Sequence, residues 1–182
     1  MTQRDKANEV PIALKPYSKR DDNPAIEFDV ARSGEVLTLS FGLSGEGAFQ
    51  GKTKIRSRVT GLWEDTCFEF FLANGSERGY TEFNFSPSGD WQVFRFSDYR
   101  SARQVDSSWL PHDFSRREET PPGQRFTFSM RSITGIWPEY PLLQAAAVIR
   151  QREEMLYYAP SHGRTPDFHL RDHFRDGSDF DL

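Results

Sequence analysis

Three short segments between Thr66 and Ser97 alternate apolar and polar residues with a period of two. Gly, Asn, Ser and Pro residues lie between them. Such alternation is typical of half-buried strands, and these separators are typical of turns. The pattern therefore predicts neighbouring antiparallel strands at 66–72, 80–86 and 91–97.

The alternation also assigns side chains to faces, because successive residues of a strand point to opposite sides of a sheet. One face of the three segments should carry the phenylalanines Phe68, Phe70, Phe83, Phe85, Phe94 and Phe96. The other face should carry a mixed polar and aromatic patch. Its expected members are Glu69, Glu82, Asn84 and Arg95, with Phe71, Tyr80 and Trp91 among them.

The turns fix the expected pairing, since a slip by one residue would move every phenylalanine to the wrong face. A loop centred between residues 76 and 77 places Glu69 opposite Asn84. A turn centred on residues 88 and 89 places Glu82 opposite Arg95 and Phe83 opposite Phe94.

Similar alternation or short apolar runs predict further strands at 25–31, 35–43, 125–131, 142–150 and 155–159. The alanines of 142–154 would also allow one helix there. The connection 98–124 is long for a compact domain, and such a loop usually covers or binds something. Trp109 within it should be either a plug on the sheet or a wall of the site.

Short strands with turn signals and little helical periodicity are typical of an all-β protein. We therefore expect an antiparallel β-sandwich or jelly roll with a long inserted loop and an irregular C-terminal tail. The predicted organisation is an N-terminal arm (1–23), a sandwich domain (24–160) and a capping tail (161–182).

Composition excludes several classes of function. The formal net charge of −4 and the pI near 5.6 argue against a nucleic-acid or anionic-membrane binder, which would need a basic surface. The polar N-terminus and the lack of a long apolar stretch predict a cytoplasmic protein. The single cysteine, Cys67, excludes an internal disulfide and favours a packing role. The oligomeric state is left open.

The C-terminal tail holds His162, His169 and His173. In a helical turn, His169 and His173 would share one face. A metal site would need a third ligand in a fixed place, so we expect a segment that folds back on the sandwich instead.

The run WEDTCFEFFL from Trp63, followed by YTEFNFSPSG from Tyr80, resembles the DOMON-like superfamily, in the branch grouped with carbohydrate-binding module family 9. The ending from Tyr157 to His169 resembles the close of small DOMON-like proteins without assigned activity. The resemblance implies a β-sandwich that holds a terminal sugar between two tryptophans. By position, it implies that Trp63 is the first tryptophan, Glu69 the acidic contact and Asn84 the strand amide.

This chain departs from that pattern at two places. The sugar binders tend to have Arg two residues before the Asn, where this chain has Glu82, although Arg95 could supply a guanidinium. The second tryptophan lacks a clear counterpart, which leaves Tyr158 or Trp137. The candidate ligand-binding residues are Trp63, Glu69, Glu82, Asn84, Trp91, Arg95, Trp109 and Tyr158.

A pyranose stacks an apolar face on an indole and needs several hydrogen-bond partners, which aromatic, Glu, Asn and Arg side chains provide. We therefore expect a non-catalytic domain that binds a carbohydrate or a similar small polar ligand. The resemblance to DOMON domains implies one alternative, a haem-binding domain that uses Met130 or Met155 with a histidine, since other members of that superfamily resemble cytochromes. Another alternative is an interaction domain without a small ligand. Neither calcium nor another cofactor is indicated.

Glu69 and Glu82 could also form a carboxylate pair like that of a glycosidase. An adjacent Arg95 would lower the pKa of Glu82, which suits a neutralised ion pair better than a general acid. We therefore expect that the protein is not an enzyme.

Overall fold

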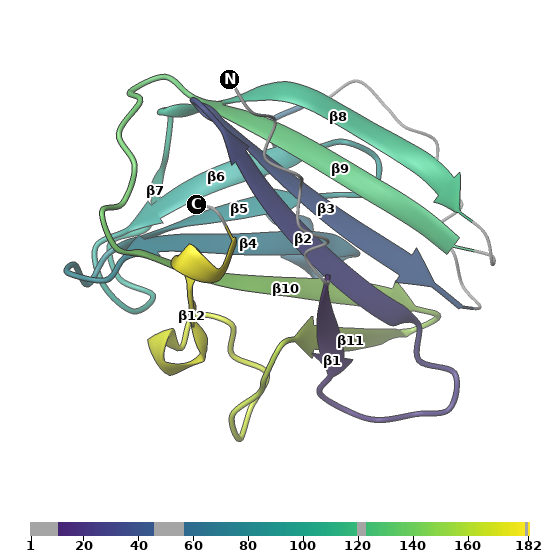
Figure 1. The fold of residues 1–182 in the computed structure, drawn as a ribbon. Helices are drawn as coiled ribbons and strands as arrows, with labels where there is room; N and C mark the ends of the chain where they lie inside the picture. The colour runs from purple at the N-terminus through teal and green to yellow at the C-terminus, as the bar shows by residue number, and fades with distance from the viewer. Residues whose placement is uncertain (1–10, 46–56, 120–122, 181) are drawn as a thin grey trace.

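The computed structural model describes residues 11–45, 57–119, 123–180 and 182, and its regular structure is almost entirely strand (Figure 1). All pairings between its strands are antiparallel, which confirms the predicted fold class. The strands are β1 (Ile12–Pro16), β2 (Ala25–Ser33), β3 (Val36–Ser44), β4 (Cys67–Asn74), β5 (Tyr80–Phe85), β6 (Trp91–Phe96), β7 (Gln104–Val105), β8 (Trp109–Glu119), β9 (Gly123–Ser132), β10 (Pro141–Gln151), β11 (Glu154–Ala159) and β12 (Arg175–Asp176).

The strands form two layers that face each other (Figure 1). The first layer has the order β8-β9-β3-β2, and the second has the order β7-β6-β5-β4-β10-β11. Strand β1 pairs with β2 in the first layer and with β11 in the second. One continuous curled sheet is thus folded over on itself to give a sandwich.

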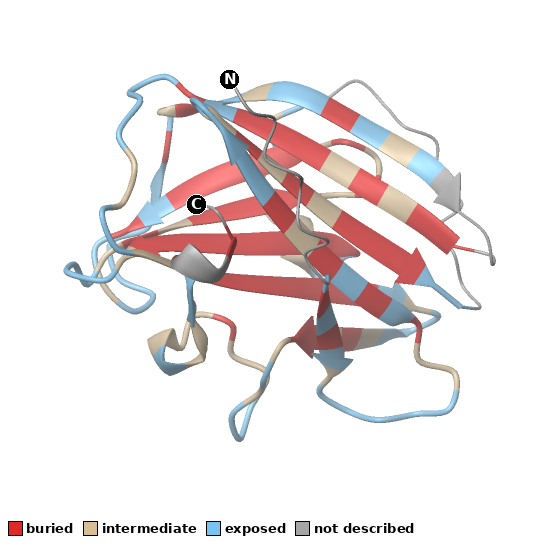
Figure 2. Ribbon diagram, viewed as in Figure 1, coloured by how far each residue is buried: buried red, intermediate tan, exposed pale blue. Residues whose placement is uncertain are grey.

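The hydrophobic core lies between the layers and is built largely from phenylalanine. Phe41 of β3 stacks on Phe68 of β4 with ring centroids 4.8 Å apart. Phe85 of β5 stacks on Phe128 of β9 at 4.5 Å. Buried residues follow the strands of both layers in Figure 2. Burying each such side chain contributes about 1.5–3 kcal/mol, so this interior is the main source of stability.

The first predicted hairpin is confirmed. Glu69 of β4 pairs with Asn84 of β5, and Phe70 pairs with Phe83. Phe68, Phe70, Phe83 and Phe85 therefore point into the core, and the acids point to the outer face of the second layer.

The predicted register of the second hairpin is wrong by one residue. Glu82 pairs with Phe94 instead of Arg95, and Phe83 pairs with Val93. The Ser86 N–H donates to the Asp90 carbonyl at 2.9 Å, which closes a three-residue loop. Gly89 has φ 99°, a left-handed conformation typical of such loops. The odd loop length inverts the two faces of β6.

One further segment differs from the expectation. The connection 98–124 contains β7 and β8, and β8 forms the edge of the first layer beside β9. A β-bulge between Pro111 and Asp113 breaks the alternation of β8, so that Trp109 and Phe114 both reach the core although an odd number of positions separates them. The segment 141–151 is strand β10, which confirms the predicted strand at 142–150 and rules out the alternative helix. This strand is buried on both faces, so its apolar run has no clear period.

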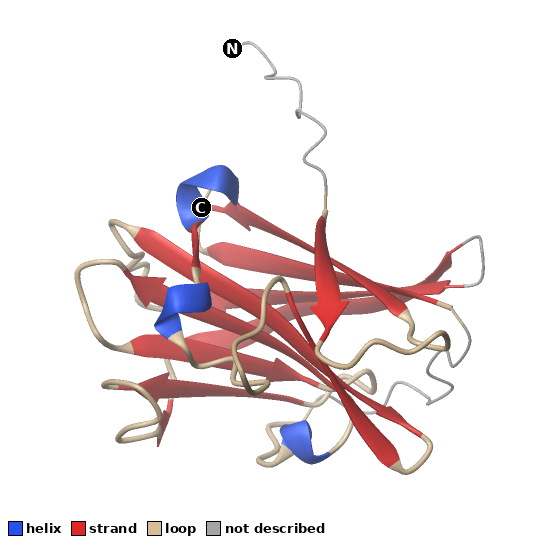
Figure 3. Cartoon of the chain, turned by 90° about the horizontal axis from the view of Figure 1, so that it is seen from below, coloured by secondary structure: helices blue, strands red, loops and turns tan. Residues whose placement is uncertain are grey.

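Three short 3-10 helices lie outside the strand layers (Figure 3). They are η1 (Leu62–Glu64), η2 (Arg171–His173) and η3 (Gly177–Phe180). Within the described ranges, no helix has the length and apolar character needed to cross a membrane.

Candidate ligand-binding site

The outer face of the second layer carries its own hydrophobic cluster, separate from the core between the layers. Segments outside the strands cover part of this face, chiefly η1 and the tail that follows β11. Phe168 of the tail is buried in the cluster, and Trp63 of η1 packs against it. The buried strand members are Cys67, Phe71, Ala73, Tyr80, Phe94, Phe96, Ala146, Val148 and Ala159.

A cavity of about 340 Å³ opens on this face, and we call it the outer cavity. Its floor consists of strand residues, and its walls come from η1, from the loop after β6 and from the tail. The floor residues are Glu69, Glu82, Phe96, Val148 and Tyr157, and the wall residues are Trp63, Arg100, Arg103, Pro166, Phe168 and His169.

Two buried carboxyl groups occupy the floor. Glu69 is 4% exposed and Glu82 is 5% exposed. Burial raises the pKa of Glu69 well above its ordinary value, the nearby Glu82 raises it further, and Arg100 opposes the change. Burial also raises the pKa of Glu82, against the hydrogen bond from Asn84 and the charges of Arg103 and Arg100. The floor therefore holds a proton more tightly than two exposed glutamates would.

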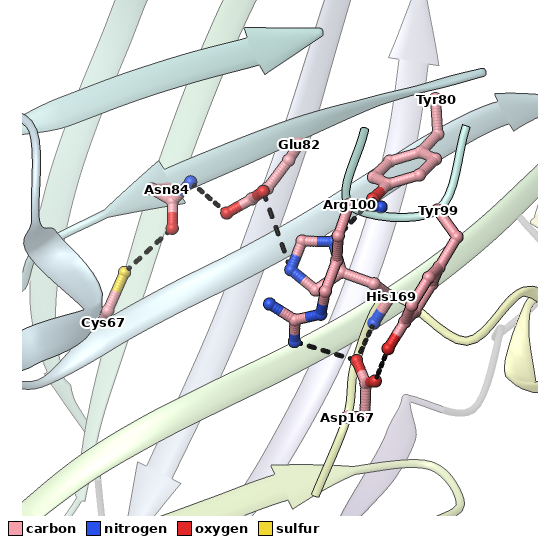
Figure 4. A network of polar contacts seen from close by, with 8 residues as sticks. All are labelled: Cys67, Tyr80, Glu82, Asn84, Tyr99, Arg100, Asp167 and His169. Carbon is pink, nitrogen blue, oxygen red and sulfur yellow. Dashed lines mark hydrogen bonds and ion pairs between the residues drawn. The ribbon is translucent and has the colours of Figure 1, made fainter. Parts of the chain in front are cut away.

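Asn84 lies next to Glu82 on β5 and orients it (Figure 4). Its side-chain N–H donates to Glu82 Oε1 at 2.7 Å. The Cys67 thiol donates to Asn84 Oδ1 at 3.5 Å. Asn84 is fully buried, so it supports Glu82 from behind and does not line the cavity. Cys67 is buried in the outer cluster, as its predicted packing role requires, and burial raises the pKa of its thiol.

His169 of the tail forms the wall next to Glu82. Its Nδ1 lies 2.7 Å from the Tyr80 hydroxyl, and its Nε2 lies 4.0 Å from Glu82 Oε2. The Tyr80 oxygen accepts a hydrogen bond from the Arg100 backbone N–H, so its own proton is available to Nδ1. Burial, with Arg100, lowers the pKa of His169 to about 4. His169 is therefore neutral at pH 7, with its proton on Nε2.

The loop after β6 anchors the tail and supplies two guanidinium groups. Arg100 donates to Asp167 at 2.9 Å, and Tyr99 donates a short hydrogen bond to the same carboxylate (Figure 4). Arg103 lies over the rings of Trp63 and Phe94, at 5.3 and 4.9 Å. Arg100 has φ 49°, a left-handed backbone that is rare outside glycine and is often found at functional sites.

The structure brings together half of the predicted ligand-binding residues. Trp63, Glu69 and Glu82 line the outer cavity, with Asn84 behind Glu82. The other four do not lie there, and the expectation that they share one patch is wrong. Trp91, Trp109 and Tyr158 pack in the core between the layers, and Arg95 lines a different cleft together with Trp109 and Trp137.

The reasons for these displacements differ. Trp91 and Arg95 lie on the inner face and not on the predicted outer face, because the register of the second hairpin inverts β6. Trp109 is a plug, with its ring 4.9 Å from Phe83. In β11 the outward residue is Tyr157, one position before the predicted Tyr158. Arg95 cannot influence Glu82 as expected, and the pKa of Glu82 is raised and not lowered.

Sequence reasoning missed Arg100, Arg103, Tyr157 and His169 as residues of the cavity. The two arginines lie in a loop, where no side-chain period exists to place them. Their only signal was the position of the segment SDYRSAR directly after a strand of the site.

Of the residues considered as metal or haem ligands, all of them within the described ranges, His169 alone lines the outer cavity. Across the part of the chain that the structure describes, no three His, Cys, Asp or Glu side chains stand together as metal ligands would. Met130 lies in the core between the layers, and His173 contacts Ser161.

Comparison with known proteins places this geometry in context. A family model described as Carbohydrate-binding family 9 matches residues 1–110. No curated protein matches the sequence. Similar solved structures include a candidate carbohydrate-binding protein from Bacteroides uniformis, with 14% identity, a TM-score of 0.61, and coverage of 91% of this chain and 83% of that chain.

Two further structures are of a family 9 carbohydrate-binding module from Caldicellulosiruptor kristjanssonii. The complex with glucose has 10% identity, a TM-score of 0.50, and coverage of 88% of this chain and 78% of that chain. The complex with cellotriose has 11% identity, a TM-score of 0.50, and coverage of 96% and 80%. At such low identity these likenesses show a shared fold.

Proposed function

Because this chain belongs to carbohydrate-binding family 9, we propose that its outer cavity is the place where it binds a carbohydrate. The family consists of non-catalytic binding modules, so the protein holds its ligand without transforming it. One observation carries the choice of site: buried Glu69 and Glu82 and the Trp63 indole line the same cavity.

The cavity has the two kinds of surface that a sugar ring requires. Trp63 and Tyr157 offer aromatic surface for the apolar face of a pyranose. Glu69 and Glu82 accept hydrogen bonds from hydroxyl groups, while Arg100 and Arg103 can donate them. A volume of about 340 Å³ lies near the lower end of small-molecule pockets, which suits a short saccharide.

The Caldicellulosiruptor kristjanssonii modules were solved with glucose and with cellotriose, which makes these the first sugars to test. Isothermal titration calorimetry on the full chain should show saturable binding of at least one of them. Trp63→Ala should weaken that binding at least tenfold, because the sugar loses its stacking surface.

Trp109→Phe is the matched control, since Trp109 lies in the core between the layers. It should bind sugar as the parent does. Failure of a broad panel of mono- and oligosaccharides to bind, or equal binding by Trp63→Ala, would contradict the proposal.

Three finer expectations stay predictions. They are membership of the wider DOMON-like superfamily, a cytoplasmic location, and the lack of nucleic-acid and membrane partners. The negative formal charge of −4 supports the last of these.

A further inference from the structure

The charge of the floor of the outer cavity bears on which sugar it accepts. The charged groups of the floor are the two carboxyls of Glu69 and Glu82, both at least nine-tenths buried. The guanidinium groups of Arg100 and Arg103 belong to the walls and are exposed. The part of a ligand that lies on the floor therefore contacts carboxyl groups, and not guanidinium groups.

These two carboxyl groups have oxygen atoms that accept no hydrogen bond from the described residues. Within the described residues, Glu69 has no hydrogen-bond partner, although its side chain borders the cavity. Glu82 accepts one hydrogen bond at Oε1, from Asn84. Its Oε2 faces His169 Nε2 at 4.0 Å, which is too long for a hydrogen bond. These free carboxyl oxygens are reached from the cavity and are not sealed in the protein interior, so they can accept hydrogen bonds from a ligand.

The cationic groups nearby are already engaged. Arg100 pairs with Asp167, and Arg103 lies over Trp63 and Phe94. His169 is neutral at pH 7. The carboxylates of Glu69, Glu82 and Asp167 thus face two guanidinium groups, which leaves one positive charge missing when all are ionised. Tyr80 and Cys67, which also face this region, are neutral because burial raises the pKa of each.

We propose that the outer cavity prefers an amino sugar, a pyranose with a protonated amine, whose ammonium group lies between Glu69 and Glu82. An ammonium group supplies the missing charge and up to three N–H donors at once. A neutral hexose supplies donors without charge, and a uronic acid would bring a carboxylate toward two others. This inference rests on the proposed function, since it names the class of sugar for the same site.

A comparison of the affinities of closely matched sugars tests the preference for an amino sugar. Glucosamine, glucose, N-acetylglucosamine and glucuronic acid share a ring and differ in one substituent. Titration calorimetry on the full chain at about pH 6.5, where an aliphatic amine is protonated, should give glucosamine an affinity at least tenfold above that of glucose. N-acetylglucosamine should fall with glucose or below it, and glucuronic acid should bind most weakly.

Removal of one floor charge should abolish the preference. In Glu82→Gln, glucosamine and glucose should bind within about threefold of each other, because the side chain keeps its shape and loses its charge. Glu69→Gln provides a second variant with the same expectation should the first fold poorly. Glu27→Gln is the control, because Glu27 is an exposed residue of β2 outside the cavity. This variant should keep the full preference for glucosamine over glucose.

Proton release gives an independent readout. An ammonium group that replaces a proton on the floor must expel that proton, so glucosamine titrated in two buffers of different ionisation enthalpy should give different apparent heats. Glucose should not, and the difference should shrink in Glu82→Gln.

The failures are distinguishable. Glucose binding as tightly as glucosamine, or an unchanged preference in both floor variants, overturns the amino-sugar inference and leaves carbohydrate binding intact. Binding of none of the sugars overturns the proposed function together with it.

Discussion

The two faces of β4 and β5 are formed by alternating side chains of the same strands, and the two faces have different roles. On the inner face, Phe68 and Phe83 pack against aromatic side chains of the opposite layer. On the outer face, Glu69 and Glu82 alternate with aromatic rings beneath segments that are not strands. One strand thus carries stability on one side and recognition on the other.

The covers of the two faces also differ. The inner face is closed by a second sheet, whose strands are fixed by ladders of backbone hydrogen bonds. The outer face is closed by a tail that depends on contacts such as those of Asp167 and His169. Such a cover can open locally while the sandwich stays folded. The following variants test this contrast, starting with the largest effect.

Phe68→Ala should destabilise the protein most. Phe68 is fully buried between the layers and contacts Phe41 at 4.8 Å and Phe126 at 5.0 Å. Loss of its ring leaves a cavity that strands cannot close, with a cost of about 3–5 kcal/mol. Urea unfolding followed by circular dichroism measures it. A loss below about 1 kcal/mol would contradict the assignment of Phe68 to the main core.

Asn84→Ala should lower the free energy of unfolding by about 2 kcal/mol and disturb the floor of the cavity. The change leaves Glu82 Oε1 without its partner, and the Cys67 thiol loses Asn84 and keeps its contact with the Phe68 carbonyl. The same unfolding experiment gives the stability, and sugar titration gives the site. Asn74→Ala, at the partly exposed end of β4, is a control that should change neither by a comparable amount.

Glu69→Gln should stabilise the protein at neutral pH by a smaller amount that depends on pH. The pKa of Glu69 is raised in the fold, so the folded state binds more protons than the unfolded state above about pH 4.5. The free energy of unfolding of the unsubstituted protein therefore falls as pH rises through the raised pKa of Glu69. The Glu69→Gln variant does not show this decrease, because glutamine does not titrate.

The measurement is urea unfolding of both proteins at a series of pH values. His169, with its pKa lowered to about 4, adds stability as pH rises from about 4 to 6.5, but it is present in both proteins and cancels in the difference. A stability difference that does not grow with pH would show that Glu69 is not held in a protonated state by burial.

Asp167→Asn should have the smallest effect on global stability, about 0.5–1 kcal/mol, because its partner Arg100 is half exposed and solvent screens the pair. It should still loosen the tail, since Tyr99, Arg100 and the His169 backbone all donate to this carboxylate. Limited proteolysis near residue 165 should be faster in the variant. Equal proteolysis rates would show that other contacts hold the cover.

The sequence could predict the floor of the site better than its walls. The positions of Glu69, Glu82 and Asn84 followed from side-chain alternation, because a strand fixes which way every second residue points. The same rule failed for Arg95, since one residue in the loop before β6 decides its face. Turn length, and not the strand pattern, was the uncertain quantity.

The walls could not be predicted for a different reason. Arg100 and Arg103 lie on a loop with left-handed residues, and His169 lies on a tail without regular structure. Their positions depend on tertiary contacts, such as that of His169 with Tyr80, which join residues far apart in the sequence. No local pattern records such contacts.

The single thiol beneath the cavity has a practical consequence. Cys67 is fully buried under the outer cover and touches Asn84, which in turn holds Glu82. A thiol reagent can reach it only after that cover moves aside, so the rate of labelling would time each opening of the site. The native thiol is thus a ready-made labelling site, with no need for an engineered cysteine.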